Sequence, residues 1–348
     1  MGFKGLKMKD KEFIKLGIIG CGFATKFVYG GSKMVPNVKI IAAVDPHITR
    51  ARKFAGRDHS YKDTEEMYKN EDLDAVYIAT PPYLHRPMIE EALKEHKHVL
   101  CEKPISGTIK DAREILRLDN KYSELKVGIN YQYRYESNCY NMVSGIKNNH
   151  LGKIYYANCN VYFSRKLEYF KKGDWRTRLE TAGGGTLLSH GSHILDILIW
   201  AFGEPVSVYG KIDNLKFKNI EVEDIGFGII KFQNGVYCQI NDSMIIKPMN
   251  KALDELTELY IFGEKGNCYL KEPWPFSSLE WDWVDKYKVK RATSGISDFS
   301  ECLSAFCNWI LNDEPFLNTV EESSKVLRLI KSLYKSSESG KEQKIEEL

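Results

Sequence analysis

The sequence predicts an α/β protein of two domains, a doubly wound parallel sheet followed by a domain with a largely antiparallel sheet. Between residues 14 and 130, short apolar runs alternate with longer amphipathic stretches, a pattern typical of parallel strands connected by helices. The later runs are long and alternate apolar with polar residues, and the hairpin signal Asn234-Gly235 lies between two of them. A chain of 348 residues suits two domains, which we place at 13–130 and 131–340.

The first domain is expected to contain short buried strands with helices on both faces of the sheet. The expected strands are Ile14–Ile19, Lys39–Val44, Ala75–Ala79, Val99–Leu100 and Lys126–Ile129. The amphipathic stretches between them include Thr49–Ala55, Pro87–His96 and Ile109–Leu118. Because ligands bind outside the carboxyl ends of the strands in an open parallel sheet, the residues that follow each strand are the first candidates for a site.

The second domain is expected to begin with a helix over Asn138–Asn148. Its expected strands are Ile154–Phe163, Val206–Ile212, Ile225–Phe232, Val236–Ser243 and Leu256–Phe262. Two helical segments near the end of the chain, Phe299–Leu311 and Val320–Tyr334, are expected to pack back across the first domain. Three tyrosines alternate with polar residues as one face of a half-buried strand would, and we assign them no functional role: Tyr131, Tyr133 and Tyr135.

Composition narrows the class of protein. A hydrophobic content of 43% and a charged content of 28% are those of a soluble globular protein. The net charge of +3 is small and the lysines are dispersed, which argues against a nucleic-acid partner. Eight cysteines without a Cys-x-x-Cys pair, and the lack of a secretory leader, indicate reduced thiols in a cytoplasmic protein. No apolar run approaches the ~18 residues of a membrane span, so no membrane association is expected.

A glycine turn closes the first expected strand and predicts a pyrophosphate site. Gly20 permits the tight turn, and Gly22 lets the backbone approach the phosphates. The phosphates then meet the amide groups at the start of the next helix, at Phe23 and Ala24. Thr25 replaces the third glycine of the usual fingerprint, which weakens the motif.

Asp45 ends the second expected strand, about 25 positions after the first glycine of the motif. A carboxylate there accepts the ribose hydroxyls of adenosine and repels a 2′-phosphate, which favours NAD over NADP. Arg50, at the start of the next helix, would suit a 2′-phosphate, so NADP remains the alternative cofactor. The alternative role for Asp45 is to cap that helix.

Two later strands also end in candidate residues. Thr80, Pro81 and His85 follow one strand, in a loop stiffened by two prolines where the nicotinamide end of the cofactor would pass. Pro81 also suits the start of a helix. Lys103 follows the next strand, between Glu102 and Pro104, and is expected to point into the crevice where cofactor and substrate meet. The alternative is an ordinary surface lysine in a turn.

Together these segments resemble the Gfo/Idh/MocA oxidoreductases, the family of glucose-fructose oxidoreductase and inositol 2-dehydrogenase. The matching segments occur in family order and at family spacing, and they are Gly17–Thr25, Asp45, Ile78–His85, Cys101–Pro104 and Gly183–Asp196. The resemblance covers most of the chain. It implies a Rossmann domain followed by an α/β domain whose open sheet often forms an oligomer interface, here in a homodimer or homotetramer.

The resemblance also implies hydride transfer between a nicotinamide cofactor and a hydroxyl or keto group of a sugar, polyol or nucleotide sugar. Lys103 falls on the family's catalytic lysine, His193 on its acid/base histidine, and Glu102 on the acid beside the lysine. Glu102 and Lys103 are also expected to contact the cofactor, and Lys103, Ser189 and His193 the substrate. Ser189 stands where many members carry an aspartate, four residues before the histidine. On an α-helix, positions 189 and 193 share a face. A serine there can form a hydrogen bond but cannot hold a charge.

Histidine suits the role of base for a hydroxyl proton because its pKa lies near neutrality. The Lys103 ammonium would stabilise the developing alkoxide, and the two roles can be exchanged. A metal site at His190, His193 and Asp196 is disfavoured because no cysteine or third histidine lies near, so we expect no metal. A core histidine is the other alternative. The triple glycine before this segment frees the backbone and favours a site.

Further candidates lie near the domain boundary and before the glycine run. Asn130, Gln132 and Arg134 follow the last strand of the first domain, where family members often place residues that touch nicotinamide or substrate. Trp175 and Arg176 are candidates for a sugar pocket, since an indole face suits a sugar ring.

The leading functional hypothesis is therefore an NAD-dependent dehydrogenase of sugars or sugar derivatives. One alternative is a redox-neutral enzyme, such as an epimerase or glycosidase-type enzyme, in which tightly held NAD oxidises the substrate and later reduces it again. The other is a non-catalytic NAD-binding regulator, which Ser189 encourages.

Overall fold

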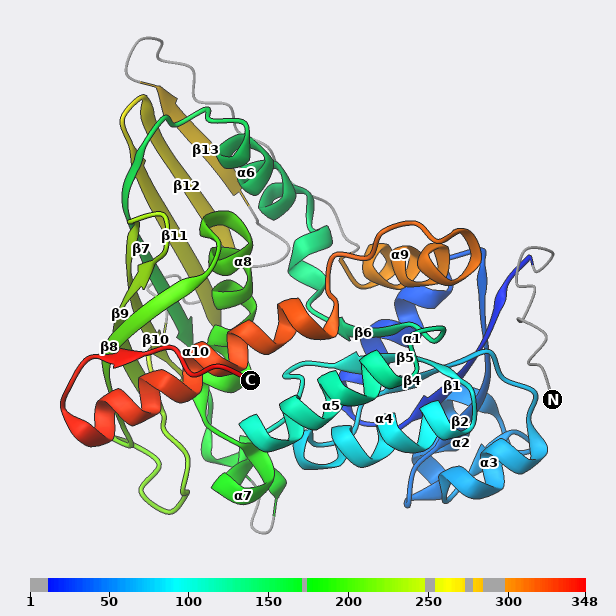
Figure 1. Cartoon of the computed structure of the whole chain (residues 1–348). Helices are drawn as coiled ribbons and strands as arrows, with labels where there is room; N and C mark the ends of the chain where they lie inside the picture. Colours follow the sequence, from blue (N-terminus) through cyan, green and yellow to red (C-terminus); the bar gives the residue numbers. More distant parts are fainter. Residues whose placement is uncertain (1–11, 171–173, 248–253, 273–277, 284–297) are drawn as a thin grey trace. The chain divides into compact units, whose positions relative to one another are not determined.

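The computed structural model describes residues 12–170, 174–247, 254–272, 278–283 and 298–348 (Figure 1). The chain forms two compact units. The first unit comprises Met1–Ile105, Arg113–Gln132 and Ser297–Glu322. The second comprises Ser106–Ala112, Tyr133–Ile296 and Ser323–Leu348. The boundary expected at residue 130 lies close to one of these divisions, whereas the return of the chain to the first unit near residue 297 is not contained in the expected ranges.

The first unit is built on a parallel sheet of the Rossmann type. Its strand order is β3-β2-β1-β4-β5-β6, and all five strand pairs are parallel. The strands are β1 (Ile14–Ile19), β2 (Val38–Val44), β3 (Ser60–Tyr61), β4 (Ala75–Ile78), β5 (His98–Glu102) and β6 (Val127–Asn130). The order reverses at β1, so the carboxyl ends of β1 and β4 flank the switch point where doubly wound sheets bind ligands. The predicted fold class of this domain is confirmed.

Helices cover the parallel sheet. They are α1 (Phe23–Ser32), α2 (Ile48–Ala55), α3 (Thr64–Asn70), α4 (His85–Lys94), α5 (Ile109–Lys121) and α9 (Asp298–Asn312). As predicted for Phe299–Leu311, α9 packs on the first unit, where it contacts α1 (Figure 1). The rings of Phe27 and Phe299 stack at 5.0 Å, and the backbone of Ser300 lies 3.1 Å from where a Cβ on Gly31 would be.

The second unit contains the larger sheet, which is almost entirely antiparallel. Its order is β13-β12-β11-β7-β10-β9-β8-β14, and only β7 and β10 pair in parallel. The strands are β7 (Ile154–Phe163), β8 (Pro205–Asp213), β9 (Ile225–Phe232), β10 (Tyr237–Ser243), β11 (Glu255–Gly263), β12 (Gly266–Glu272), β13 (Ser278–Trp283) and β14 (Gln343–Lys344). The predicted hairpin joins β9 to β10, with Gly235 at φ +88°. The predicted antiparallel sheet is confirmed.

Helices lie on one face of this sheet. They are α6 (Ser137–Lys147), α7 (Leu179–Ala182), α8 (Ser192–Phe202) and α10 (Val320–Ser339), with short 3₁₀ turns at Gln132–Tyr135, Leu167–Tyr169 and Trp175–Thr177. The expectation that the last helix packs on the first domain is wrong for most of α10. Its Ser336 hydroxyl accepts a 3.0 Å hydrogen bond from Gly210 of β8, and Leu333 fills the space above Gly210 and Gly228. Because these two glycines have no side chain, α10 can pack closely on the sheet.

The tyrosines at 131, 133 and 135 do not lie on a strand. The chain leaves β6 at Asn130 and turns into the 3₁₀ segment, so the alternation over five residues was too short to identify a strand. Tyr131 is buried, and its carbonyl accepts a 2.8 Å hydrogen bond from Asn318.

The other face of the antiparallel sheet carries exposed apolar side chains. They are Tyr156, Tyr209, Phe227, Ile229 and Tyr237, which we call the sheet-face patch. Neighbouring strands bring them together, because Tyr209 pairs with Ile229 and Tyr237 pairs with Tyr156. Ordinary protein surfaces rarely expose apolar residues in such contiguous sets.

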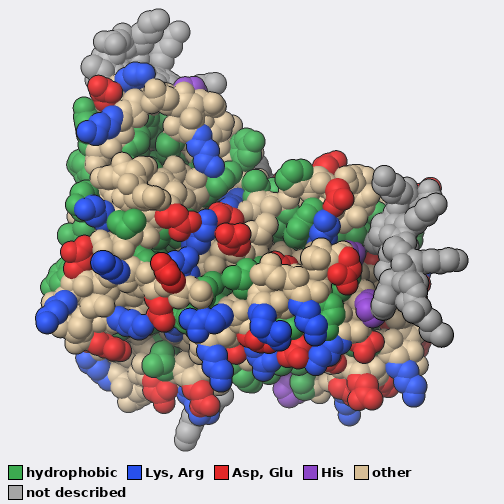
Figure 2. Space-filling model, viewed as in Figure 1, with side chains coloured by type: hydrophobic (Ala, Val, Ile, Leu, Met, Phe, Trp, Pro, Cys, Tyr) green, Lys and Arg blue, Asp and Glu red, His purple; other side chains and the backbone are tan. Residues whose placement is uncertain are grey.

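Charged side chains of both signs are interspersed over the face that Figure 2 shows, in keeping with the small net charge. In the described part of the chain, every helix is too short or too polar to cross a membrane. All eight cysteines are buried free thiols.

Candidate functional site

Two glycines of the turn after β1 are needed for different reasons. Gly20 has φ +89°, and a Cβ there would lie 2.8 Å from the Ala79 carbonyl oxygen, so the fold itself requires glycine. Gly22 has φ −87°, and a Cβ there would have no atom within 4 Å. The fold therefore does not require Gly22, and the open space beside its backbone suits a ligand that approaches the turn closely.

The start of α1 is suited to bind an anion. Gly22 is the N-cap residue, no side chain caps the helix, and its first turn has no acidic residue. The amide groups near Phe23 and Ala24 thus retain the partial positive charge of a helix N-terminus. Thr25, in place of the third glycine, is buried and donates a 2.7 Å hydrogen bond to the Gly20 carbonyl, which fixes the helix to the turn.

Asp45 connects the end of β2 to the same turn. Its Oδ2 accepts a 3.0 Å hydrogen bond from the Cys21 amide, and its Oδ1 accepts one of 2.8 Å from the His47 amide. The N-cap of α2 is His47, so Asp45 is not the helix cap that the alternative interpretation required. The Arg50 guanidinium lies 4.0 Å from Oδ1. A carboxylate has further lone pairs, so the ribose role stays a prediction for Asp45.

The loop after β4 contains Thr80, Pro81 and His85. Pro81 is the N-cap of a 3₁₀ turn over Pro82–Leu84, which confirms that it starts a helical segment. The Thr80 Oγ1 is buried and has no hydrogen-bond partner among the described residues, so this hydroxyl suits a ligand group.

His85 lies in the interior of the first unit, and its cofactor contact stays a prediction. Its side chain is completely buried, Nε2 lies 2.9 Å from the Thr80 carbonyl oxygen, and Nδ1 lies 2.9 Å from that of Pro104. Burial lowers the pKa of its imidazole. Both ring nitrogens face backbone oxygens, so His85 holds the loop after β4 against the loop that follows Lys103.

Glu102 and Asn130 lie in the interior at the ends of β5 and β6. The Glu102 carboxylate accepts hydrogen bonds from the Tyr77 hydroxyl, from Asn130 Nδ2 (2.8 Å) and from the Lys103 amide (3.2 Å). Burial, and secondarily Glu102, raises the pKa of Tyr77. This internal network holds the backbone of the half-buried Lys103, and the cofactor contact of Glu102 and the substrate contact of Asn130 stay predictions.

The triple glycine is packed tightly, which differs from the flexible backbone that the sequence predicts. A Cβ on Gly183 would lie 2.4 Å from Gly107 Cα, one on Gly184 2.1 Å from the Tyr334 hydroxyl, and one on Gly185 1.9 Å from the Glu223 carbonyl oxygen. Each glycine admits a different neighbour. The turn is thereby held rigidly before the helical segment that carries His193.

Two buried acids that sequence reasoning missed support this turn. The Glu223 carboxylate accepts hydrogen bonds from the amides of Gly185 (2.7 Å) and Leu187 (3.1 Å) and from the Tyr334 hydroxyl. Asp242 accepts a 2.5 Å hydrogen bond from the Thr186 hydroxyl.

Burial raises the pKa of the Glu223 carboxyl and, in the same way, that of Asp242 to about 8. Nothing in the local sequence distinguishes these two acids from surface acids. Only the fold brings β9 and β10 against the turn.

The segment after the glycines is not a continuous α-helix. Leu187–Gly191 forms a π-helical turn that leads directly into α8. Positions 189 and 193 therefore do not have the i,i+4 relationship expected of an α-helix. A π turn of this kind is frequent at functional sites.

Ser189 belongs to a chain of hydrogen bonds around His190. The Arg165 guanidinium lies 3.2 and 3.3 Å from His190 Nε2, and Ser189 Oγ lies 3.0 Å from Nδ1. Arginine only donates, so Nε2 is the acceptor and Nδ1 carries the proton. The Ser189 hydroxyl donates in turn to the Gly185 carbonyl at 2.7 Å. Ser189 thus orients His190, and its substrate role stays a prediction.

His193 lies in the first turn of α8, half-buried, and its ring stacks on Tyr133 with centroids 4.6 Å apart. Asp196, one turn later, forms a two-pronged ion pair with Arg134, with both contacts at 2.8 Å. Both side chains are at most 2% exposed. Asp196 therefore has a buried arginine as its counter-ion, which disfavours a metal there, and the ligand contact of Arg134 stays a prediction. Gln132 is buried too.

Trp175 and Arg176 form a short 3₁₀ turn before α7. The guanidinium carbon of Arg176 lies 4.3 Å from the Trp175 ring centre, and its NH1 lies 3.2 Å from both carboxylate oxygens of Asp174. Both side chains are half-buried, and their part in a sugar pocket stays a prediction.

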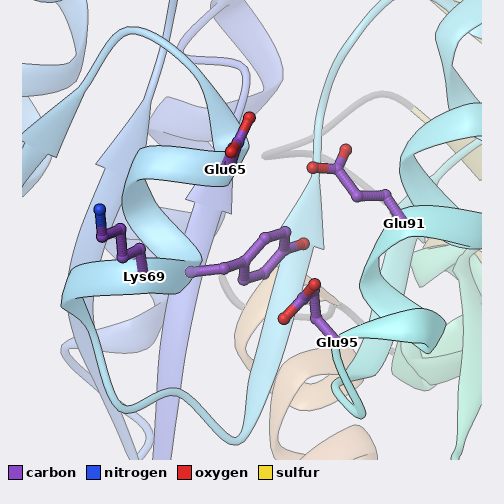
Figure 3. Close-up of a pocket in the computed structure, with 5 residues that line it drawn as sticks. Glu65, Lys69, Glu91 and Glu95 are labelled. Atoms are coloured by element: carbon purple, nitrogen blue, oxygen red, sulfur yellow. The ribbon is translucent and has the colours of Figure 1, made fainter.

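A surface pocket of about 380 Å³ lies between α3 and the end of α4 in the first unit (Figure 3). Its lining is Glu65, Tyr68, Lys69, Glu91 and Glu95. Three acids and one lysine give it an excess of negative charge, which disfavours a dinucleotide phosphate. It contains none of the predicted site residues.

Comparison with known proteins identifies both units. The family model described as "Oxidoreductase family, NAD-binding Rossmann fold" matches residues 14–131, and the GFO/IDH/MocA C-terminal domain model matches residues 142–269. Among curated relatives, the 1,5-anhydro-D-fructose reductase of Ensifer adhaerens is 28% identical over 66% of this chain and 69% of its own length. The D-glucoside 3-dehydrogenase of Escherichia coli is 23% identical over 94% of this chain and 96% of its own.

Solved structures share the fold over nearly the whole chain. The WlbA dehydrogenase of Bordetella pertussis, crystallised with NADH and UDP-GlcNAcA, has a TM-score of 0.84 at 23% identity and covers 97% of this chain and 100% of its own. A levoglucosan dehydrogenase in complex with NADH and L-sorbose has a TM-score of 0.85 at 17% identity, with coverage of 97% and 100%. The two family models and the glycine turn that fits a dinucleotide lead to one conclusion: the chain belongs to the GFO/IDH/MocA family of NAD-binding oxidoreductases.

Proposed function

We propose that the protein is an NAD-dependent dehydrogenase that acts on a secondary hydroxyl, or the corresponding ketone, of a sugar, polyol or nucleotide sugar. The observation that carries the proposal is the turn after β1, where Gly22 leaves open space at an uncapped helix N-terminus and Asp45 lies beside it. The amides at Phe23 and Ala24 would bind the pyrophosphate of NAD, Asp45 the adenosine ribose, and Thr80 the nicotinamide half. NADP is the weaker alternative because Asp45 repels a 2′-phosphate.

Bound NAD supplies the acceptor for a hydride from the alcohol carbon. His193 takes the hydroxyl proton in the direction of oxidation and returns it in the direction of reduction. Lys103 stabilises the negative charge that develops on the substrate oxygen. The reverse assignment, with Lys103 as the base, uses the same two side chains. The network of Glu102 and Asn130 holds the backbone from which Lys103 extends.

Turnover by two variants tests this proposal. The purified enzyme is mixed with NAD and a panel of sugars, inositols and nucleotide sugars, and NADH absorbance is followed. We expect Lys103→Ala and His193→Ala each to lower kcat by about 10²–10⁴-fold while NAD still binds. The matched control is Lys53→Ala, which removes an exposed lysine of α2. Turnover in both variants at the wild-type rate would overturn the proposal, and product without NADH would indicate a redox-neutral reaction instead.

We further propose that the enzyme is a cytoplasmic homodimer or homotetramer assembled through the sheet-face patch. Five large apolar side chains on adjacent strands are more exposed than a monomer tolerates well, and a second copy of the same sheet would cover them. The eight buried free thiols suit a reducing compartment. Ile229→Asp should shift the molar mass measured by light scattering to that of the monomer, whereas an unchanged mass contradicts this interface.

A further inference from the structure

One cationic cluster of the second unit has no role in the chemistry proposed so far. Arg165 follows β7, and its guanidinium carbon lies 4.9 Å from the Phe163 ring centre and 5.2 Å from that of Tyr169. The guanidinium of Arg176 lies 5.2 Å from the same Tyr169 ring. The guanidinium groups of both arginines therefore lie close to the Tyr169 ring. We call Arg165, Tyr169, Arg176 and His190 the arginine cluster.

Arg165 is poorly neutralised by the protein. Its side chain directs both of its hydrogen bonds at a single atom, Nε2 of His190, and that atom can accept only if the imidazole is neutral. Among the residues that the structure describes, no carboxylate forms an ion pair with Arg165. Burial raises the pKa of the Glu255 carboxyl, and the charge of Arg165 lowers it to a smaller extent. A guanidinium has five N–H donors, so most of them remain for a ligand.

The cluster is connected to the candidate site by the hydrogen-bond chain already described. His190 receives Arg165 on one nitrogen and meets the Ser189 hydroxyl with the other, and His193 follows three residues later in the same helical segment. Phe163 packs against His190 with ring centres 4.1 Å apart and ring planes tilted by 31°, so a rotation of the imidazole away from Arg165 would lose this contact. The half-buried Arg165 guanidinium is thus held against His190, which precedes the proposed base by three residues.

We infer that the arginine cluster binds an anionic group of the substrate, a carboxylate or a phosphate, so that the enzyme prefers acidic sugars to neutral ones. This inference rests on the proposed function, because it assigns the substrate class of that site. The planar fork of arginine matches two oxygens of a carboxylate or phosphate, and a neutral sugar offers only hydroxyls to it. Arg176, which Asp174 partly neutralises, adds a second positive charge.

Equilibrium binding to the NAD-saturated full-length enzyme tests the inference without any turnover. The probes are D-glucuronate, D-glucose 6-phosphate and D-glucose, measured by titration calorimetry. We expect one acidic probe to bind at least about tenfold more tightly than D-glucose, and the winning probe tells carboxylate from phosphate. Arg165→Gln should remove this advantage, so that the acidic probe binds no more tightly than D-glucose, and Arg165→Lys should keep part of it. The control is Arg178→Gln, which removes an exposed arginine paired with Glu180.

Equal binding of the three probes by the wild type, or no measurable binding of any, overturns the inference. So does an Arg165→Gln variant that keeps the full advantage. A rise in ionic strength should weaken binding of the acidic probe more than binding of D-glucose. This measurement needs only the wild type if the variant does not fold. Failure of the dehydrogenase proposal gives a different result: no NADH forms, but the enzyme still binds the acidic probe more tightly than D-glucose.

Discussion

The Tyr334 hydroxyl donates a 2.7 Å hydrogen bond to the Glu223 carboxylate. The same hydroxyl oxygen packs against Gly184, where a Cβ would lie only 2.1 Å from it. The pair joins α10, near the end of the chain, to the loop before β9 and to the glycine turn that precedes His193. Glu223 completes its bonding with two amides of that turn. The orientation of the proposed base thus depends on a phenol 141 residues further along the chain, since 334 − 193 = 141.

The first prediction concerns this pair. Tyr334→Phe leaves the buried Glu223 carboxylate without its hydroxyl donor, which should cost about 1–3 kcal/mol in the free energy of unfolding. We expect kcat to fall as well, with an unchanged dissociation constant for NAD, because the turn belongs to the second unit. Urea unfolding and steady-state kinetics measure the two effects. Tyr140→Phe, which alters an exposed tyrosine of α6, is the control, and equal stability of the two variants would contradict the prediction.

The second prediction separates the two glycines of the turn after β1. Gly22→Ala should leave the melting temperature nearly unchanged, because nothing lies within 4 Å of the new Cβ, yet weaken NAD binding by about tenfold or more. Gly20→Ala should destabilise the protein, since it combines a positive φ, worth about 1–2 kcal/mol, with contact to the Ala79 carbonyl. Scanning calorimetry measures the melting temperature of both variants, and titration calorimetry measures their affinity for NAD. If Gly22→Ala binds NAD as the wild type does, the pyrophosphate lies elsewhere.

The third prediction concerns cofactor choice. Asp45→Asn removes the charge that repels a 2′-phosphate and leaves Arg50 nearby, so the ratio of NADP to NAD affinity should rise by about 10- to 100-fold. Binding of both cofactors is measured by quenching of tryptophan fluorescence. Asp58→Asn, an exposed acid of the same unit, should leave the ratio unchanged. A constant ratio in the Asp45 variant would remove Asp45 from the ribose site.

The fourth prediction is a pH dependence of stability. Burial raises the pKa of Asp242 to about 8, so the folded state holds a proton that the unfolded state releases near pH 4. Stability contributed by this proton is present at low pH and is lost as the pH rises toward 8. Asp242→Asn cannot titrate, and its melting temperature should fall less than that of the wild type between pH 5 and pH 8. Parallel curves for the two proteins would show that Asp242 is ionised throughout.

Lys331 of α10 changes the stability in the opposite direction at higher pH. Burial lowers the pKa of Lys331 to about 8, and its ammonium lies 2.5 Å from the Gly183 carbonyl. Between pH 8 and its ordinary value of 10.5 the unfolded chain binds the proton more tightly, so stability rises with pH there. The comparison of Asp242→Asn with the wild type is therefore confined to the window below pH 8.

The sequence predicted most of the fold because both sheets have strong local patterns. Buried parallel strands such as Ala75–Ile78 appear as continuous apolar runs, and half-exposed strands such as β10 alternate apolar with polar residues over Cys238–Asn241. Two-residue strands such as β3 leave no pattern to read. The position of α10 could not be predicted, because its amphipathic face fits any apolar surface and only Gly210 and Gly228 select the sheet of the second unit.

The candidate site was predicted only in part. Motifs locate the strand ends, and therefore Gly20, Asp45 and Lys103, but they do not show which side chains turn inward. His85, Glu102 and Asn130 follow the strands as expected and are buried in hydrogen bonds to their neighbours. Glu223 and Arg165 lie far from any motif, and their roles depend on strands that the fold places beside the glycine turn.

The π turn at Leu187–Gly191 changes which side chains lie on one helical face. A helix advances about 100° per residue, so one added residue turns the side chains before it relative to those after it. Residues before the π turn therefore do not lie on the same helical face as His193. Ser189 instead forms hydrogen bonds with the His190 ring and the Gly185 carbonyl, so the geometry of an α-helical residue four positions before the histidine does not apply to it.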